Sequence, residues 1–155
     1  MSKSTAPSSL DAEDTPSPGP GHLPDDDLVL TDLPEPAAGP GHGTFTLLGQ
    51  TVQARRLETG LHVVATPIGN LGDITVRALE TLAGAGLIAC EDTRMTRRLT
   101  ERYGITTHLV PYHDHNGAAM RPKLLARLAA GDAVALVSDA GTPLVSDPGY
   151  KLVVE

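Results

Sequence analysis

The 155-residue chain has a single cysteine, Cys90, and no tryptophan. One cysteine excludes an internal disulfide and a zinc site built from several cysteines, and a buried thiol in a cytoplasmic protein is the simplest interpretation. Only 3% of the residues are aromatic, so few rings can stack on the bases of single-stranded nucleic acid. The sequence has neither an apolar run of about 18 residues nor a basic segment followed by an apolar core at its N-terminus. It therefore predicts no membrane span and no signal peptide, and we expect a cytoplasmic location.

The net charge of −7 is unevenly distributed along the chain. Residues 1–58 hold eight of the thirteen prolines, nine of the nineteen acids and three of the twelve bases. Such a segment cannot bury enough apolar surface to offset the entropy of ordering it. We therefore expect a disordered acidic tail over 1–58 and a folded domain over 59–155. Residues 44–52 have a strand-like composition, but nothing nearby in the sequence offers them a clear pairing partner.

The folded part alternates apolar runs with helical patterns. Strands are predicted over 61–67, 87–90, 107–112 and 133–139. Helices are predicted over 74–86, 91–105, 121–131 and 148–155. Asp73 is expected to cap the first helix, and Asp92 or Thr93 the second. This order predicts an α/β fold with a mainly parallel sheet and helices on both faces.

Unusual residues follow each predicted strand, in the motifs TPIGNLGD, CEDTR, PYHDHN and SDAGTP. The carboxyl ends of parallel strands meet at one edge of a sheet, where ligands of such folds bind. The first of these loops matches neither common phosphate-binding glycine pattern and contains no lysine, so by itself it predicts only a turn before a helix. In the last loop, Gly141 can adopt a positive φ and Pro143 stiffens the turn. A stiff loop can hold a ligand without a large ordering cost.

The segments 64–82, 88–105, 111–116 and 134–153, taken together and in this order, resemble a known family. They are similar to the N-terminal half of the methyltransferase I family of small-subunit rRNA ribose 2′-O-methyltransferases, within the tetrapyrrole methylase superfamily. The resemblance implies two α/β domains with S-adenosylmethionine in the cleft between them, and a homodimer at full length. It implies methylation of a cytidine ribose in the decoding region of 16S rRNA, in the small ribosomal subunit.

The resemblance also nominates cofactor contacts in the first and last loops. From the first loop these are Pro67 and Ile68. From the last loop they are Gly141, Thr142, Pro143, Leu144 and Val145. The first loop, residues 66–70, lacks the Gly-Pro-Gly-Asp type of turn found in relatives that methylate tetrapyrroles. This departure favours the rRNA branch over a porphyrinoid substrate.

A ribose hydroxyl is a poor nucleophile, so a neighbouring base or polarising group would assist methyl transfer. Asp139 is the preferred carboxylate, His113 is a second candidate base, and Asn116 is a candidate for orienting the substrate. Asp73 and Asp92 are more simply explained as helix caps. His113 and His115 form a pair without a third ligand in the loop, so we predict no metal site there.

Four arginines recur at helical spacing in the second predicted helix: Arg94, Arg97, Arg98 and Arg102. Arginine on one face of a helix can meet RNA phosphates, which position an RNA rather than read its bases. An ordinary solvated face, partly paired with Glu91 or Glu101, explains the pattern equally well. Arg121 and Lys123 form a weaker second candidate, and the acidic tail would repel RNA.

The sequence ends at Glu155, about two turns into the last predicted helix. We therefore expect the N-terminal part of a longer two-domain enzyme, with the 155 residues alone inactive. Two alternatives remain open at this stage. The chain can be a non-catalytic binding or structural module, or part of a tetrapyrrole C-methyltransferase.

Overall fold

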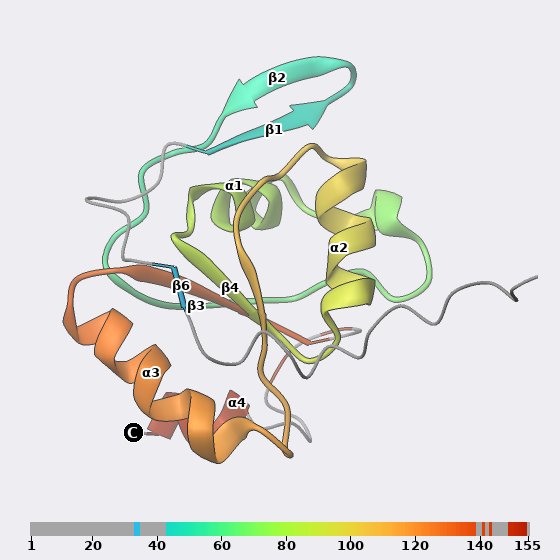
Figure 1. Ribbon diagram of the computed structural model, residues 1–155. Helices are drawn as coiled ribbons and strands as arrows, with labels where there is room; N and C mark the ends of the chain where they lie inside the picture. The colour runs from blue at the N-terminus through green and yellow to red at the C-terminus, as the bar shows by residue number, and fades with distance from the viewer. Residues whose placement is uncertain (1–32, 35–42, 139–140, 142, 144–148, 155) are drawn as a thin grey trace, which may run out of the picture. The chain divides into compact units, whose positions relative to one another are not determined.

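The computed structural model describes residues 33–34, 43–138, 141, 143 and 149–154 (Figure 1). The strands are β1 (Thr44–Leu47), β2 (Gln50–Gln53), β3 (Gly60–Val64), β4 (Leu87–Cys90), β5 (Leu109–Pro111) and β6 (Ala133–Val137). The helices are the 3₁₀ turn η2 (Leu71–Asp73), α1 (Val76–Gly84), α2 (Thr93–Arg102), α3 (Gly117–Ala129) and α4 (Gly149–Val154).

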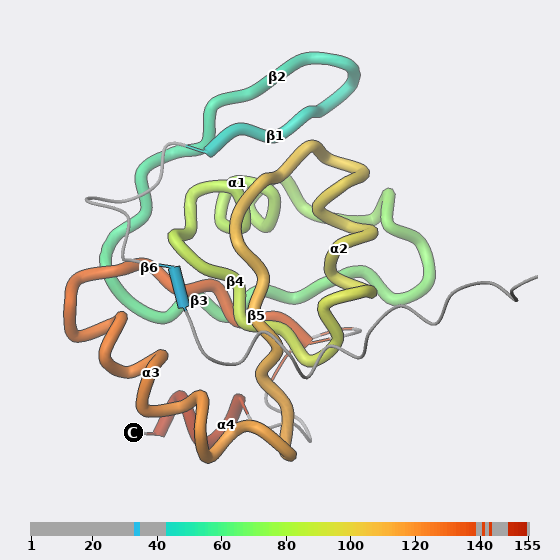
Figure 2. The backbone as a smooth tube through the Cα atoms, in the orientation of Figure 1, coloured from blue at the N-terminus to red at the C-terminus, as the bar shows by residue number. Residues whose placement is uncertain are grey.

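Four strands form a parallel sheet in the order β3-β6-β4-β5. Every residue of β4 and β6 is buried, because these two strands lie in the middle of the sheet with helices on both faces. Figures 1 and 2 show α1 and α2 on one side of the sheet and α3 and α4 on the other. The predicted α/β fold with a parallel sheet is confirmed. The structure contains no described helix that is both long enough and apolar enough to cross a membrane.

The prediction of a disordered tail is wrong for residues 43–58. β1 and β2 pair with each other as an antiparallel hairpin, with Thr44 opposite Gln53. Phe45 is 1% exposed and belongs to the core, and the Thr46 amide donates to the Tyr103 carbonyl at 2.7 Å. The hairpin is thus buried, through Phe45, in a cluster that includes residues of α1 and of the segment that follows α2. Both elements lie far from the hairpin in the sequence. The rest of the predicted tail, 1–32 and 35–42, lies outside the described residues.

The helix starts differ from prediction at α1. The cap of α1 is Thr75, whose hydroxyl accepts from the Ala78 amide at 3.1 Å. Asp73, predicted for this role, instead ends η2 and accepts from the Asn70 side chain at 3.2 Å. The extra turn of η2 places Asp73 too early to cap α1. For α2 the predicted cap is confirmed, because the Asp92 carboxylate accepts from the Arg94 amide.

For the other helices, the positions of glycine and proline predict the observed ends only in part. Gly104 follows α2 with a φ of 62°, a left-handed conformation that ends the helix as predicted. By contrast, α3 begins at Gly117, four residues before the predicted start, and contains Pro122. Pro122 is the sixth residue of this helix, so it lacks the amide hydrogen that would donate to the Ala118 carbonyl four residues earlier, and α3 continues past it without this bond. Pro148, the predicted start of α4, lies outside the described residues.

Candidate functional site

The carboxyl ends of β3, β6 and β4 lie side by side. The register pairs Val64 with Val137, and Val137 with Cys90. β5 is paired with β4 on the far side, where Pro111 lies opposite Cys90. The loops that carry the unusual residues therefore leave the sheet at one edge, as the sequence predicted.

The first and last of these loops are joined directly. The Thr66 amide donates to the Gly141 carbonyl at 2.9 Å, and the Gly141 amide donates to the Thr66 carbonyl at 3.0 Å. The Thr66 hydroxyl adds a bond of 3.0 Å to the Ser138 carbonyl. We call this set of contacts the Thr66–Gly141 bridge. It is an isolated antiparallel bridge beyond the ends of the parallel strands β3 and β6, and it fixes the two loops against each other.

Gly141 adopts a φ of 85°, which favours glycine over residues with a side chain. A Cβ built at this position would lie 3.6 Å from Cδ1 of Ile68, an ordinary van der Waals contact, so the Gly141 backbone packs close to the Ile68 side chain. Ile68 itself is 76% exposed. A glycine backbone beside exposed apolar surface suits a cofactor with both apolar and polar parts.

The other nominated cofactor residues are placed differently. Pro67 is half-buried, and Pro143 is among the fully buried side chains, so the Pro143 ring supports its loop from within. Thr142, Leu144 and Val145, together with the candidate base Asp139, lie outside the described residues. Their assignments stay predictions.

At the end of β4, Asp92 is engaged by Arg94 through both of its carboxylate oxygens. Oδ1 accepts from the Arg94 amide at 2.8 Å and from Nε at 3.1 Å, and Oδ2 accepts from Nη2 at 3.0 Å. The side-chain bond from Arg94 outweighs the effect of partial burial and lowers the pKa of Asp92 below its usual value. The carboxylate therefore stays ionised as a cap and is not suited to accept a proton from a substrate.

At the end of β5, Asn116 holds its own loop together. Its Nδ2 donates to the Pro111 carbonyl at 2.9 Å, and its Oδ1 accepts from the His113 amide at 2.9 Å. The His113 ring stands edge-on to His115, and no residue that the structure describes makes a hydrogen bond with its buried Nδ1. β4 separates β5 from β6, which places these strand ends about 10 Å apart. Roles for His113 and Asn116 in catalysis stay predictions.

The four arginines of α2 all face solvent, while Thr96 and Leu99 on the opposite side of the helix are buried. Arg94 is bound to Asp92, and the guanidinium carbon of Arg102 lies 5.8 Å from the centre of the Tyr103 ring. We call this surface the arginine face. Arg121 and Lys123 are partly buried on α3, on the other side of the sheet.

Sequence reasoning missed the contact between Thr66 and Ser138. These residues begin the motifs TPIGNLGD and SDAGTP, but no pattern indicated that they meet, and only the structure shows their hydrogen bond. Among the residues that the structure describes, no cluster of three histidines, cysteines or acids is arranged to hold a metal ion.

Comparison with known proteins identifies the family. The family model described as Tetrapyrrole (Corrin/Porphyrin) Methylases matches residues 60–155. A protein of Mesorhizobium japonicum named ribosomal RNA small subunit methyltransferase I is 62% identical over 110 residues, covering 70% of this chain and 37% of that protein. Proteins of the same name from a Synechocystis strain and Escherichia coli O157:H7 are 59% and 57% identical over 93 residues, each covering 60% of this chain.

The chain spans about a third of the length of these relatives, 33% of the Synechocystis protein and 32% of the Escherichia coli protein. The family model, by contrast, covers well over half of the chain and includes both loops of the Thr66–Gly141 bridge. The resemblance found in the sequence is confirmed: the chain belongs to the tetrapyrrole (corrin/porphyrin) methylase family.

Proposed function

We propose that this chain supplies the cofactor-binding side of an S-adenosylmethionine-dependent enzyme that methylates the ribose 2′-oxygen of a cytidine in 16S rRNA. The Thr66–Gly141 bridge is the observation that carries the proposal. It joins two loops at the ligand edge of a parallel sheet and holds the Gly141 backbone next to the exposed Ile68. The relatives named as small-subunit rRNA methyltransferases support the choice of substrate.

The chemistry needs mainly alignment. When bound, S-adenosylmethionine would supply a methyl group on a positively charged sulfur, and the sulfur would depart as a neutral thioether on attack by the ribose oxygen. Holding donor and acceptor in line removes much of the entropic barrier to such a displacement. Here the bridge fixes Gly141 and Ile68, which would contact the cofactor through backbone and apolar surface. The hydroxyl proton needs an acceptor, for which Asp139 and His113 are the candidates.

The arginine face offers a place for the RNA. Arg94 lies in the first turn of α2, next to the ligand edge, and Arg98 and Arg102 follow at intervals of one helical turn. This row extends about 12 Å away from the edge. Guanidinium groups in such a row can hold successive phosphates while the target ribose reaches the cofactor.

A chimaera tests the activity directly. This chain would replace the matched segment of the Mesorhizobium japonicum relative, and the product would be given methyl-labelled S-adenosylmethionine and unmodified 30S subunits. We expect label in 2′-O-methylcytidine after digestion of the 16S rRNA to nucleosides. Label on a base would refute ribose methylation, and transfer to a porphyrinoid instead of RNA would favour the tetrapyrrole alternative. A folded chimaera that transfers no methyl group would favour the non-catalytic module.

A further inference from the structure

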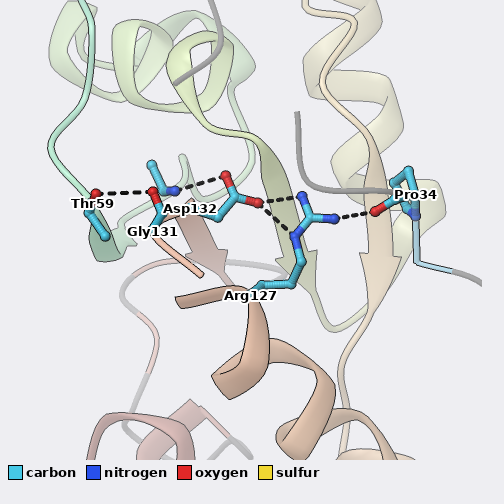
Figure 3. Close-up of polar contacts among 6 residues, drawn as sticks. Pro34, Thr59, Arg127, Gly131 and Asp132 are labelled. Carbon is cyan, nitrogen blue, oxygen red and sulfur yellow. Dashed lines mark hydrogen bonds and ion pairs between the residues drawn. The ribbon is translucent and has the colours of Figure 1, made fainter. Parts of the chain in front are cut away.

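A buried ion pair lies at the opposite edge of the sheet, where the strands begin (Figure 3). Arg127, near the end of α3, is 5% exposed, and Asp132, just before β6, is 6% exposed. Arg127 Nε donates to Asp132 Oδ2 at 2.7 Å, and Nη2 of the same guanidinium also contacts that oxygen. Asp132 Oδ1 accepts from the Ala133 amide at 2.9 Å. Each charge is therefore compensated within the fold.

The surroundings of the pair are backbone and leave little freedom. A Cβ on Gly86 would lie 2.2 Å from Asp132 Oδ1, so the carboxylate is packed directly against that glycine. The Asp132 carbonyl accepts from the Gly60 amide at 3.1 Å, and the neighbouring Gly131 carbonyl accepts from the Thr59 hydroxyl at 3.0 Å. The pair thus sits where β3, β4 and β6 begin.

The remaining edge of the guanidinium contacts a distant part of the chain. Arg127 Nη1 donates to the main-chain carbonyl of Pro34, 93 residues earlier in the sequence (Figure 3). A planar guanidinium with several fixed N–H groups can serve a carboxylate on one edge and a carbonyl on another. The acceptor is a main-chain carbonyl, so the contact depends on the path of the backbone at Pro34 and not on a side chain of the N-terminal segment.

A second contact fixes the same segment closer to the hairpin. The Gly43 carbonyl accepts from the Ala54 amide at 2.9 Å, and a Cβ on Gly43 would lie 1.8 Å from the Ala83 carbonyl oxygen. No other residue fits at position 43 without a shift of the backbone. The chain entering the hairpin is therefore held at Gly43 and again at Pro34.

We propose that the Arg127–Asp132 pair is a docking site for the chain's own N-terminal segment, which it binds through the Pro34 carbonyl. The neutralised pair does not attract the segment by net charge. Instead, Arg127 Nη1 provides a buried N–H donor in a fixed orientation. This donor loses the Pro34 carbonyl as its acceptor when the segment leaves. Residues 33–34 are thereby anchored at the edge of the sheet opposite to the Thr66–Gly141 bridge, independently of the proposed methyl transfer.

The sharpest test is Arg127→Lys in the full chain. Lysine can pair with Asp132, but its single ammonium cannot also present a fixed N–H to Pro34. We expect thermolysin to cleave the Val29–Leu30 bond on the order of 10-fold faster in the variant, because the segment no longer accepts a hydrogen bond from a charged donor. Cleavage before Leu10 and before the buried Leu124 should not change. Arg77→Lys, on the exposed surface of α1, is the matched control.

A pair of truncations gives an independent measurement. A chain that begins at Asp32 keeps Pro34, and one that begins at Gly43 does not. We expect the first to melt near the full chain and the second to melt roughly 4–8 °C lower. Arg127→Lys should lower Tm in the longer truncation and add little in the shorter one, because the two changes remove the same hydrogen bond.

Three results would overturn the proposal. These are unchanged cleavage at Val29–Leu30 in Arg127→Lys, equal acceleration at Leu124, or additive Tm losses in the two truncations.

Discussion

Thr66 and Gly141 exchange two backbone hydrogen bonds although they follow different strands of the sheet. The bond from the Thr66 hydroxyl to the Ser138 carbonyl fixes the same pair of loops from a second direction. This triple connection gives the edge a defined shape before any ligand binds. Preorganisation of this kind lowers the ordering cost of binding and of aligning two reactants.

Replacing Gly141 with alanine tests the role of this glycine backbone in cofactor binding. An L-residue at a φ of 85° costs about 1–2 kcal/mol, and the new Cβ would enter the space beside Ile68. We expect a loss of stability of that size in urea unfolding. In the chimaera we also expect S-adenosylmethionine to bind about 10-fold more weakly or worse, measured by calorimetry.

Gly49→Ala is the matched control for this change. Gly49 has a φ of 76° at the hairpin tip, with open space around its Cβ position. It should cost similar stability and leave cofactor affinity unchanged. Equal cofactor affinity in the two variants would remove Gly141 from the proposed site.

The Thr66 hydroxyl provides a second test. Thr66→Val keeps the shape and both backbone bonds but removes the donor to the Ser138 carbonyl. We expect a loss of about 1 kcal/mol in unfolding free energy and weaker cofactor binding in the chimaera. Thr66→Ser should restore most of both losses, because it restores the hydroxyl. If serine and valine behave alike, the hydroxyl does not hold the bridge.

The Thr66–Gly141 bridge lies at the part of the fold that the sequence predicts best. Parallel strands bring their carboxyl ends to one edge, so the approach of the loops at Pro67 and Gly141 followed from the order of strands and helices. The sequence could not show that Thr66 is the residue that pairs, since its partner depends on the register of β3 against β6. Asp92 was predictable as a cap because its acceptor role is local, within two residues.

The sequence did not predict the hairpin or the docking site, because both depend on contacts between residues that lie far apart in the chain. Phe45 is buried by α1 and by the segment after α2, so its strand acquires a partner only in the folded domain. In the sequence, nothing distinguishes Arg127 from other basic residues of predicted helices. Only the structure shows its contacts with Asp132 and the Pro34 carbonyl. Composition underestimated residues 43–58, where Phe45 and Ala54 are buried in the core and Leu47, Val52 and Leu57 pack against it.

The arginine face predicts a salt-dependent interaction with RNA. Arg97→Glu combined with Arg98→Glu should weaken binding of the chimaera to a 16S rRNA fragment. The dependence of log affinity on log salt should become shallower by about 1 for each phosphate that the protein no longer neutralises. Arg77→Glu, an exposed arginine on α1, makes the same type of charge change outside this face. A slope unchanged from the parent protein would mean that the arginine face is simply solvated.

The Asp92–Arg94 pair predicts how stability depends on pH. Because Arg94 lowers the pKa of Asp92 in the folded state, the unfolded chain takes up the proton at a higher pH than the folded one. The stabilisation is therefore complete above the unfolded pKa and is lost as the pH falls through the folded pKa. Asp92→Asn keeps a good cap but loses the ion pair, at a cost below about 1 kcal/mol at pH 7.

Urea unfolding of the parent and Asp92→Asn between pH 7 and pH 2.5 measures this difference. We expect the gap in unfolding free energy to narrow below about pH 4, where the carboxyl of an unfolded chain becomes protonated. Arg94→Met should remove most of the same pH dependence, because the Arg94 side chain is the largest cause of the lowered pKa. A gap that stays constant down to pH 2.5 would show that Asp92 acts only as a neutral hydrogen-bonding cap.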